Sequence, residues 1–348
     1  MAKKEKKMLA VDVGSTSIKV IEMSRSGKGY QIDRASIEAM PKNAWKDGLP
    51  LVIDVVTASI SNAIRVSGSS IKNVIVSVPT AAAMTRVLPI MSGLNDDSIE
   101  ESLEAGISQY LPFDAAEVQI DFQKIGPTPG TSGSQDVLLV AIEKKFINDR
   151  DVCFSNAGCD LSIVDVDIFA LANLINMTDP LGSYPAHYAV VVIDIGANRT
   201  GFHVLHGDSS VYAREQAFGG DRLTEIISEM EGLSFEQAEN KKKVGLWQEE
   251  VMQQSLQTFL AEFADQILNA LQVYQPNNPR IEIQKIVLVG GGSRVAGIDL
   301  AIQDTMHIPV QILDPANLFA LSPRVTRVSQ ADLRSMSVAC GLAMRNFK

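Results

Sequence analysis

The chain has 348 residues, of which 46% are hydrophobic and 21% charged, and its formal net charge is −10. This length exceeds that of one hydrophobic core, so we expect two domains or several subdomains. The acidic balance argues against nucleic acid as a main partner, and no apolar run approaches the roughly 18 residues needed to cross a bilayer. Direct membrane insertion is therefore not expected. The three cysteines form no metal or redox motif, which is typical of a reduced, cytosolic protein.

Two short apolar runs open the chain, at residues 9–13 and 18–23, with the β-branched content of buried strands. The turn between them consists of glycine and hydroxyl residues, which suits a hairpin that approaches a ligand closely. Asp12 ends the first run beside Gly14, where a carboxylate can hold a hydrated metal next to a phosphate. An ordinary hairpin with a polar turn is the alternative that this segment leaves open.

The following pattern predicts a strand at 30–39, a helix at 49–66 and a strand at 71–79. A second group of elements then begins near residue 81. It comprises a strand at 84–89, a helix capped by Asn95, strands at 118–125 and 137–142, a helix at 146–157 and a strand at 161–166. We expect this β-α-β-β-α-β unit, residues 81–163, to be an inserted subdomain.

The opening pattern returns at residues 189–205, after a predicted helix at 167–177. Asp194 and Gly196 align with Asp12 and Gly14, and the copies lie 182 residues apart (194 minus 12), about half the chain. A duplication of that length predicts two domains of like fold that face each other.

The second half continues with a strand at 210–218, a helix that Asp221 would cap, a helix at 235–243 and a long amphipathic helix. A buried strand at 283–289 then runs into Gly290, Gly291, Gly292 and Ser293. Glycines after such a strand let the backbone approach a ligand, although many strand-to-helix turns carry them. The final helix, at 335–345, has small residues suited to close packing.

Two hairpins and one glycine turn therefore converge in this interpretation. Facing hairpins would surround a polyphosphate with backbone N–H groups, which suit phosphate because they are fixed and numerous. The two aspartates suit Mg²⁺, which binds few carboxylates and keeps its waters. The glycine turn would lie under the base and ribose.

This arrangement resembles the actin, Hsp70 and sugar-kinase ATPase superfamily, which implies a duplicated α/β fold of the ribonuclease H-like type. Residues 12–19 match its first phosphate loop, 194–200 its second and 286–293 its adenosine loop. The insert resembles that of the cell-division protein FtsA rather than that of actin. The chain is similar over nearly its whole length to the PilM family of type IV pilus assembly, in the segments VDVGSTSIKVIEM (11–23), QYLPFDAAEVQIDFQ (109–123), VDVDIFALANL (164–174), VVVIDIGANRT (190–200), FGGDRLTEII (218–227) and GLAMR (341–345).

The resemblance implies ATP and Mg²⁺ as cofactors, with Asp12 and Asp194 positioning the metal through water. The implied phosphate ligands are Lys19 and the backbones of Gly14, Ser15, Thr16, Gly196, Ala197 and Asn198. Lys19 as a solvent-facing strand residue is the alternative. The implied adenosine site comprises Gly290, Gly291, Gly292 and Ser293, with Glu239 and Lys242 touching ribose or base. No catalytic residue is assigned. Asp165 or Asp167 would align water, unless they cap a helix, and we expect slow hydrolysis at most.

The resemblance also implies a division of the chain and a partner. The expected subdomains are 1A (8–80, completed by 164–186 and 331–348), the FtsA-type insert 1C (81–163), 2A (187–222, completed by 283–330) and 2B (223–282). The family is a cytoplasmic scaffold that docks the N-terminal peptide of the inner-membrane protein PilN, in the cleft between 1A and 1C. Attachment at the inner face of the membrane would come through that partner. Other pilus components and self-association are further expected contacts.

Two alternatives stay open on the sequence. An FtsA-like cell-division protein would carry a C-terminal linker and an amphipathic membrane helix, and here the chain stops about three residues after GLAMR. A sugar- or acetate-type kinase would need a substrate cleft with a general base, and no segment of the sequence indicates such a cleft.

Overall fold

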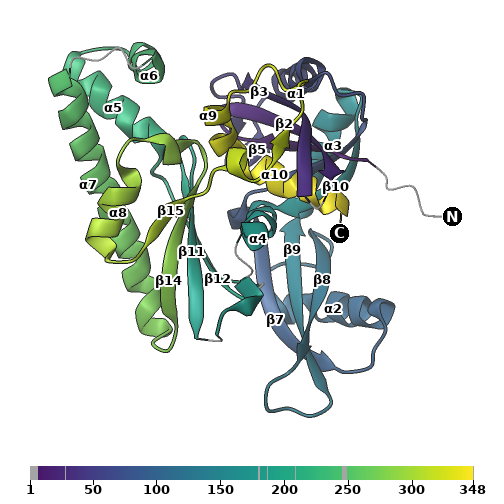
Figure 1. Ribbon diagram of the computed structural model, residues 1–348. Helices are drawn as coiled ribbons and strands as arrows, with labels where there is room; N and C mark the ends of the chain where they lie inside the picture. Colours follow the sequence, from purple (N-terminus) through teal and green to yellow (C-terminus); the bar gives the residue numbers. More distant parts are fainter. Residues whose placement is uncertain are drawn as a thin grey trace.

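The computed structural model describes residues 7–27, 29–178, 181–185, 187–207, 209–244 and 249–347. Two mixed sheets face each other across a pair of central helices, and a smaller sheet extends from the first of them (Figure 1). None of the helices within the described residues is long and apolar enough to cross a membrane.

The first sheet has six strands in the order β10-β6-β1-β2-β3-β16. β1 and β2 form the predicted antiparallel hairpin, and β1 runs parallel to β6. Helices α1 (Ile53–Ser67) and α3 (Lys144–Asn156) pack on the outer face. The strands are β1 (Leu9–Val13), β2 (Ser17–Ser26), β3 (Gly29–Ala39), β6 (Asn73–Val78), β10 (Asp160–Val166) and β16 (Ala320–Leu321).

The second sheet has five strands in the order β13-β12-β11-β14-β15 and repeats the hairpin of the first. Its outer face carries the helices α5 (Gly220–Glu231), α6 (Phe235–Val244), α7 (Glu249–Tyr274) and α8 (Ile298–Met306). The strands are β11 (Tyr188–Ile195), β12 (Thr200–His206), β13 (Ser209–Gln216), β14 (Glu282–Val289) and β15 (Val310–Ile312).

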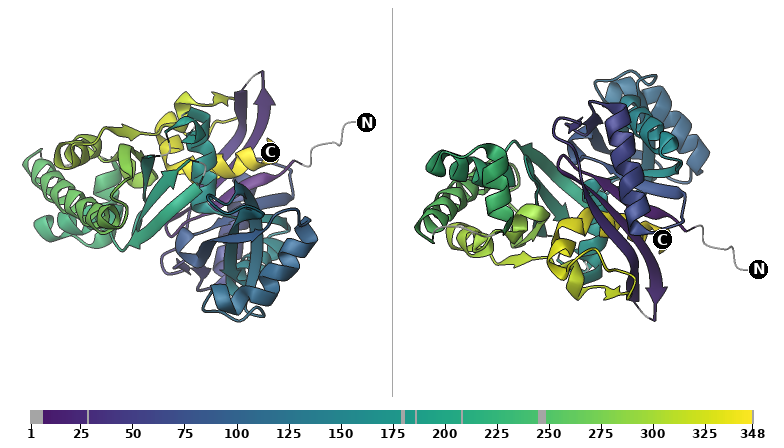
Figure 2. Two further views of the ribbon diagram at one scale, coloured as in Figure 1. Left: turned by 90° about the horizontal axis from the view of Figure 1, so that it is seen from below. Right: turned by 90° about the horizontal axis from the view of Figure 1, so that it is seen from above.

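Helices α4 (Asp167–Thr178) and α10 (Ser337–Met344) lie between the two sheets (Figures 1 and 2). They share one hydrophobic core with residues of both sheets, such as Ile75 and Val192. A side chain at Gly341 would collide with the carbonyl group of Ala170, so the glycine allows the two helices to touch. The small-residue helix was predicted to pack closely, and this contact confirms it.

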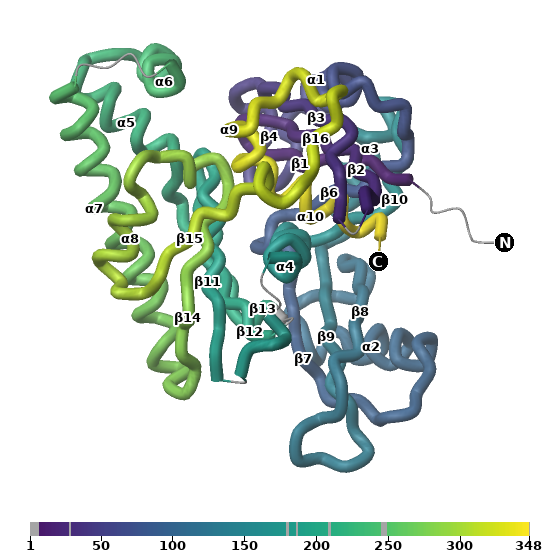
Figure 3. The backbone as a smooth tube through the Cα atoms, in the orientation of Figure 1, coloured from purple at the N-terminus to yellow at the C-terminus, as the bar shows by residue number. Residues whose placement is uncertain are grey.

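The third sheet, in the order β7-β9-β8, stands apart from the other two (Figure 3). It comprises β7 (Ala83–Met91), β8 (Val118–Pro127) and β9 (Ser134–Glu143), and α2 (Asp96–Tyr110) covers one face. Asn95 caps α2 as expected, because its side chain accepts a hydrogen bond from the Ser98 amide.

Two subdomain boundaries differ from the sequence prediction. We counted α3 and β10 in the insert, but β10 pairs with β6 and α3 packs against α1 in the first domain. We assigned 283–330 to the second domain, but β16 pairs with β3 of the first sheet. Short strands are hard to assign from sequence, because their partner supplies the stabilising contacts.

Two helix starts also differ. The predicted helix at 49–66 begins later, because Leu49 and Pro50 form β5 (Leu49–Pro50), which pairs with β4 (Trp45–Lys46). Helix α5 begins at Gly220 with Gly219 as its N-cap, so Asp221 lies in the first turn rather than at the cap. The remaining short elements are α9 (Gln330–Leu333) and the 3₁₀ turns η1 (Thr80–Ala82), η2 (Leu181–Ser183), η3 (Gln275–Asn277), η4 (Gly291–Arg294), η5 (Pro315–Asn317), η6 (Arg334–Met336) and η7 (Arg345–Phe347).

Candidate functional site

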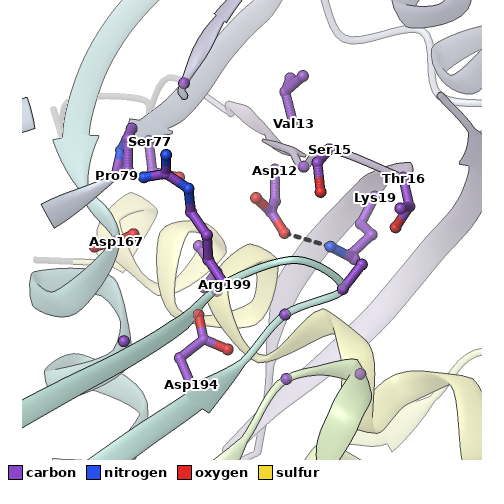
Figure 4. A pocket seen from close by; sticks show the side chains of 18 of the residues that line it. Asp12, Val13, Ser15, Thr16, Lys19, Ser77, Pro79, Asp167, Asp194 and Arg199 are labelled. Carbon is purple, nitrogen blue, oxygen red and sulfur yellow. Dashed lines mark hydrogen bonds and ion pairs between the residues drawn. The ribbon is translucent and has the colours of Figure 1, made fainter. Parts of the chain in front are cut away.

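A cavity of about 190 Å³ lies where the two hairpins and the glycine turn after β14 meet. Asp12 and Lys19 of the first hairpin lie on one side, and Asp194 of the second lies across from them (Figure 4). The duplication thus places two like turns around one space, as the sequence predicted.

The two turns close in the same way. The Gly14 amide donates to the Ser17 carbonyl at 3.0 Å, and the Gly196 amide donates to the Arg199 carbonyl at 2.8 Å. The hydroxyl of Ser15 lies 3.3 Å from the side-chain oxygen of Asn198, so the turns also touch each other. Turns held this way present fixed backbone dipoles to an anion.

Lys19 forms an ion pair with Asp12 at 2.9 Å, and both side chains are largely buried. The strand register dictates this contact, because Lys19 is the direct partner of Asp12 across the β1–β2 ladder. In the second hairpin, Gly201 takes the position opposite Asp194. Both hairpins therefore have the aspartate, but only the first has a lysine opposite it.

Asp194 lies across the cavity from Asp12. Burial and, after it, the neighbouring Asp12 raise the pKa of Asp194 to about 6, whereas Lys19 opposes the rise. Gly290 has a φ of +82°, and any side chain there would collide with the Asp194 carboxylate. The glycine turn is thus pressed against the acidic group, and a bound cation would relieve the repulsion between the two aspartates.

Not all the predicted ligands line this cavity. The lining includes Gly290 and Gly291 together with Asp12, Gly14, Ser15, Thr16, Lys19, Asp194, Gly196, Ala197 and Asn198. Gly292 and Ser293 lie behind the wall, where the Ser293 hydroxyl donates to the Gly290 carbonyl at 2.7 Å and shapes the turn. Their buried positions give them a structural role in the turn.

Glu239 and Lys242 lie on α6, outside the cavity wall. Lys242 pairs with Glu239 at 2.6 Å and donates to the Gly220 carbonyl at 2.9 Å. The start of α5 is in turn bonded to the second hairpin, because the Gly220 and Asp221 amides donate to the carbonyls of Gly196 and Ala197. The Glu239–Lys242 pair therefore supports the start of α5, which lies behind the second hairpin turn.

The two candidate catalytic aspartates occupy different places. Asp167 begins α4, faces the cavity and accepts a hydrogen bond from the Thr80 hydroxyl (Figure 4). Burial raises its pKa to about 8, while the Thr80 hydrogen bond opposes the rise. Asp165 is buried away from the cavity and forms an ion pair with Arg345 at 3.1 Å.

Several wall residues were not among the predicted ligands. Arg199 contacts Asp47 of the first domain and forms an ion pair with Glu215 at 2.8 Å. Arg150 reaches the wall from α3 and, like Trp45, comes from a segment without a sequence signature. The other wall residues outside the predicted set are Val13, Gly48, Ser77, Pro79, Gly201, His203, Ser335, Ser337 and Val338. Arg199 lies within the matched phosphate loop and could have been suspected from it.

Solved structures define the class of fold. The chain superposes on EutJ, an ethanolamine utilization protein of Carboxydothermus hydrogenoformans, with a TM-score of 0.59 at 14% identity, over 97% of this chain and 89% of that one. For MreB5 of Spiroplasma citri, solved with AMPPNP bound, the TM-score is 0.53 at 13% identity, over 97% and 95% of the chains. The fold is that of the actin-like ATPases, as predicted.

A family model identifies which group of proteins within this fold class the chain resembles. Residues 10–347 match the model described as type IV pilus assembly protein PilM. The chain belongs to this family. A structure titled as a PilM–PilN type IV pilus biogenesis complex agrees with it, at a TM-score of 0.80, 20% identity and 99% coverage of both chains.

A curated relative matches over part of its length. The cell division protein FtsA of Enterococcus faecalis is 24% identical over 257 residues, which is 67% of this chain and 57% of that protein. The match therefore spans less than two thirds of the relative. The family result favours pilus assembly over both alternatives, FtsA-like division and small-molecule phosphorylation.

Proposed function

We propose that this chain is an ATP-binding scaffold of type IV pilus assembly, which docks the N-terminal peptide of a PilN-type inner-membrane protein. One observation carries the nucleotide part. Both Asp-x-Gly hairpins and the turn at Gly290 and Gly291 line a single cavity in a chain of the PilM family.

The cavity residues suit Mg-ATP. Turn amides of 14–16 and 196–198 would hold the phosphates, and Lys19 would leave Asp12 to reach them. The turn at Gly290 would lie under the adenosine. Gly292 and Ser293 would support that turn, and Glu239 with Lys242 would support α5.

The donor set also fits a magnesium ion that is held mostly by water and phosphate. Among the described residues, no three His, Cys, Asp or Glu side chains are arranged to enclose a metal. Mg²⁺ needs no such enclosure, because it binds one or two carboxylates and keeps several waters. Asp12 and Asp194 would hold those waters, and a bound cation would favour the charged form of Asp194, whose pKa is raised by burial and by Asp12.

We also propose that this chain hydrolyses ATP slowly at most. Of the two aspartate candidates, Asp167 faces the cavity, and Asp165 is engaged with Arg345. A carboxyl group with a pKa of about 8 is mostly protonated at neutral pH, so it accepts a proton from water poorly. We therefore assign the nucleotide mainly to shaping the scaffold.

A second cavity supports the docking part. It measures about 420 Å³ and lies between the start of β7, the start of α4 and β13. Its walls include Thr85 of the insert, Phe169 of the first domain and Tyr212 of the second domain, so it lies where the insert meets both domains. An extended peptide would pack its apolar side chains there, and the partner would hold the scaffold at the inner face of the membrane.

The test is a calorimetric titration of the full chain with the N-terminal peptide of the PilN-type protein from the same organism. We expect saturable binding that Thr85→Arg weakens about tenfold by filling the cavity. Glu104→Arg, on the exposed face of α2, is the matched control. Absence of binding, with and without ATP, contradicts the docking proposal. Loss of binding only in the Glu104 variant would contradict docking in this cavity and would assign the peptide contact to α2.

A further inference from the structure

Arg150 is a buried cation in the wall of the first cavity. Its side chain is 1% exposed, and it approaches from α3 of the first domain. The Nε donates to the Ser77 carbonyl at 3.0 Å, and Nη1 donates to the Phe146 carbonyl at 2.9 Å. The guanidinium also lies 5.1 Å from the ring centre of Trp45. These contacts hold the side chain in one place before any ligand arrives.

This cation has no carboxylate partner within ion-pair distance among the residues that the structure describes, and its acceptors there are the two carbonyl groups. Burial lowers its pKa to about 10, so it is charged at neutral pH. The carboxylates of Asp149, Asp167 and Asp12 act on the guanidinium only from beyond ion-pair distance. Burying a charge costs several kcal/mol, and an anion bound in the cavity against the guanidinium would reduce that cost.

The position of Arg150 indicates which anion. Ser77, Pro79 and Asp167 lie on the side of Asp12 away from Lys19 (Figure 4). Arg150 is bonded to Ser77 and belongs to this side. The turn at Gly290, which would carry the adenosine, belongs to the second domain. A nucleotide that runs from that turn between the hairpins would therefore present its last phosphate to the side where Arg150 lies.

We propose that Arg150 binds the terminal phosphate of the nucleotide and so makes the site prefer a triphosphate over a diphosphate. This inference rests on the proposed nucleotide function. A guanidinium has donors in a planar fork that matches a phosphate, and here two of its nitrogens are already anchored. Lys19 is a less selective group for the last phosphate, because it pairs with Asp12 and lies on the other side of Asp12 from Ser77 and Asp167.

The test is calorimetric binding of Mg-ATP and Mg-ADP to the full-length protein and to two variants. We expect Arg150→Gln to weaken ATP binding about tenfold or more and to leave ADP affinity within about threefold. Arg150→Lys, which keeps the charge but not the fork, should fall between them. The control is Arg345→Gln, which removes an arginine paired with buried Asp165 outside the cavity and should leave the ATP/ADP ratio unchanged.

Thermal unfolding separates binding from packing. A lower Tm with an unchanged ATP/ADP ratio in the Arg150 variants would assign the residue to packing and overturn the inference. If Arg150→Gln does not fold, the ratio in Arg150→Lys decides the question in the same way. A wild-type protein that binds ATP and ADP equally overturns this inference alone, whereas one that binds neither overturns the nucleotide proposal as well. Peptide docking is measured independently.

Discussion

Lys19 and Asp12 face each other across the β1–β2 ladder, and their side chains meet at 2.9 Å inside the cavity. The lysine thus neutralises an aspartate that we assign to magnesium. Nucleotide binding would exchange this ion pair for two others, Lys19 with phosphate and Asp12 with hydrated Mg²⁺.

Replacing Lys19 by methionine should weaken ATP binding about tenfold, because the phosphates lose a charged donor. The measurement is titration with ATP in excess Mg²⁺. Lys124→Met is the control, because it removes an ion pair with Asp96 on the insert. Unchanged affinity in the Lys19 variant would support a strand lysine without a role in binding.

Asp194→Ala should weaken Mg-ATP binding about tenfold or more, which corresponds to about 1.4 kcal/mol. The same change should have little effect on ATP binding in EDTA, since the carboxylate acts through the metal. Asp304→Ala, at an exposed position on α8, is the control. An equal loss with and without Mg²⁺ would contradict the metal role.

Asp167 should make the stability of the nucleotide-free protein depend on pH. Its pKa is raised from 3.8 to about 8, so the folded state holds a proton that the unfolded state releases. Its contribution to stability is therefore greatest below pH 3.8 and is lost as the pH rises toward 8. Asp167→Asn should flatten this decline and raise the Tm near pH 8 relative to the wild type. Thermal unfolding at several pH values tests this, with Asp304→Asn as control, and parallel curves for wild type and variant would refute it.

Gly341→Val should destabilise the fold by about 1–3 kcal/mol, because the added side chain meets the Ala170 carbonyl between α10 and α4. Ala58→Val, at an exposed site within α1, is the control, and it should cost only a few tenths of a kcal/mol. Denaturant unfolding gives both values. Equal effects would mean that the central helices can separate without cost.

The residues themselves determined the hairpins, the duplication and about half of the cavity's polar wall. Asp12 with Gly14 and Asp194 with Gly196 stand out because a polar turn between two apolar strands is a local pattern, and its repetition needs only alignment. The glycine turn at 290–291 could also be predicted from a local pattern. Gly290 adopts a φ of +82°, a conformation that favours glycine, so the turn requires this residue type. Residues of this kind carry their conformational requirement in their own identity.

Only the tertiary structure decided what completes the site. Arg150 lies on α3 and donates a hydrogen bond to the carbonyl of Ser77, which is 73 residues earlier in the chain. No local sequence pattern predicts that contact. Packing likewise places Asp167 in the cavity and turns Asp165 toward Arg345, although the two differ by two positions in the chain. β10 and β16 join the first sheet through partners distant in sequence. Local patterns specify turns and buried faces, whereas the meeting of distant side chains depends on how the two domains pack around α4 and α10.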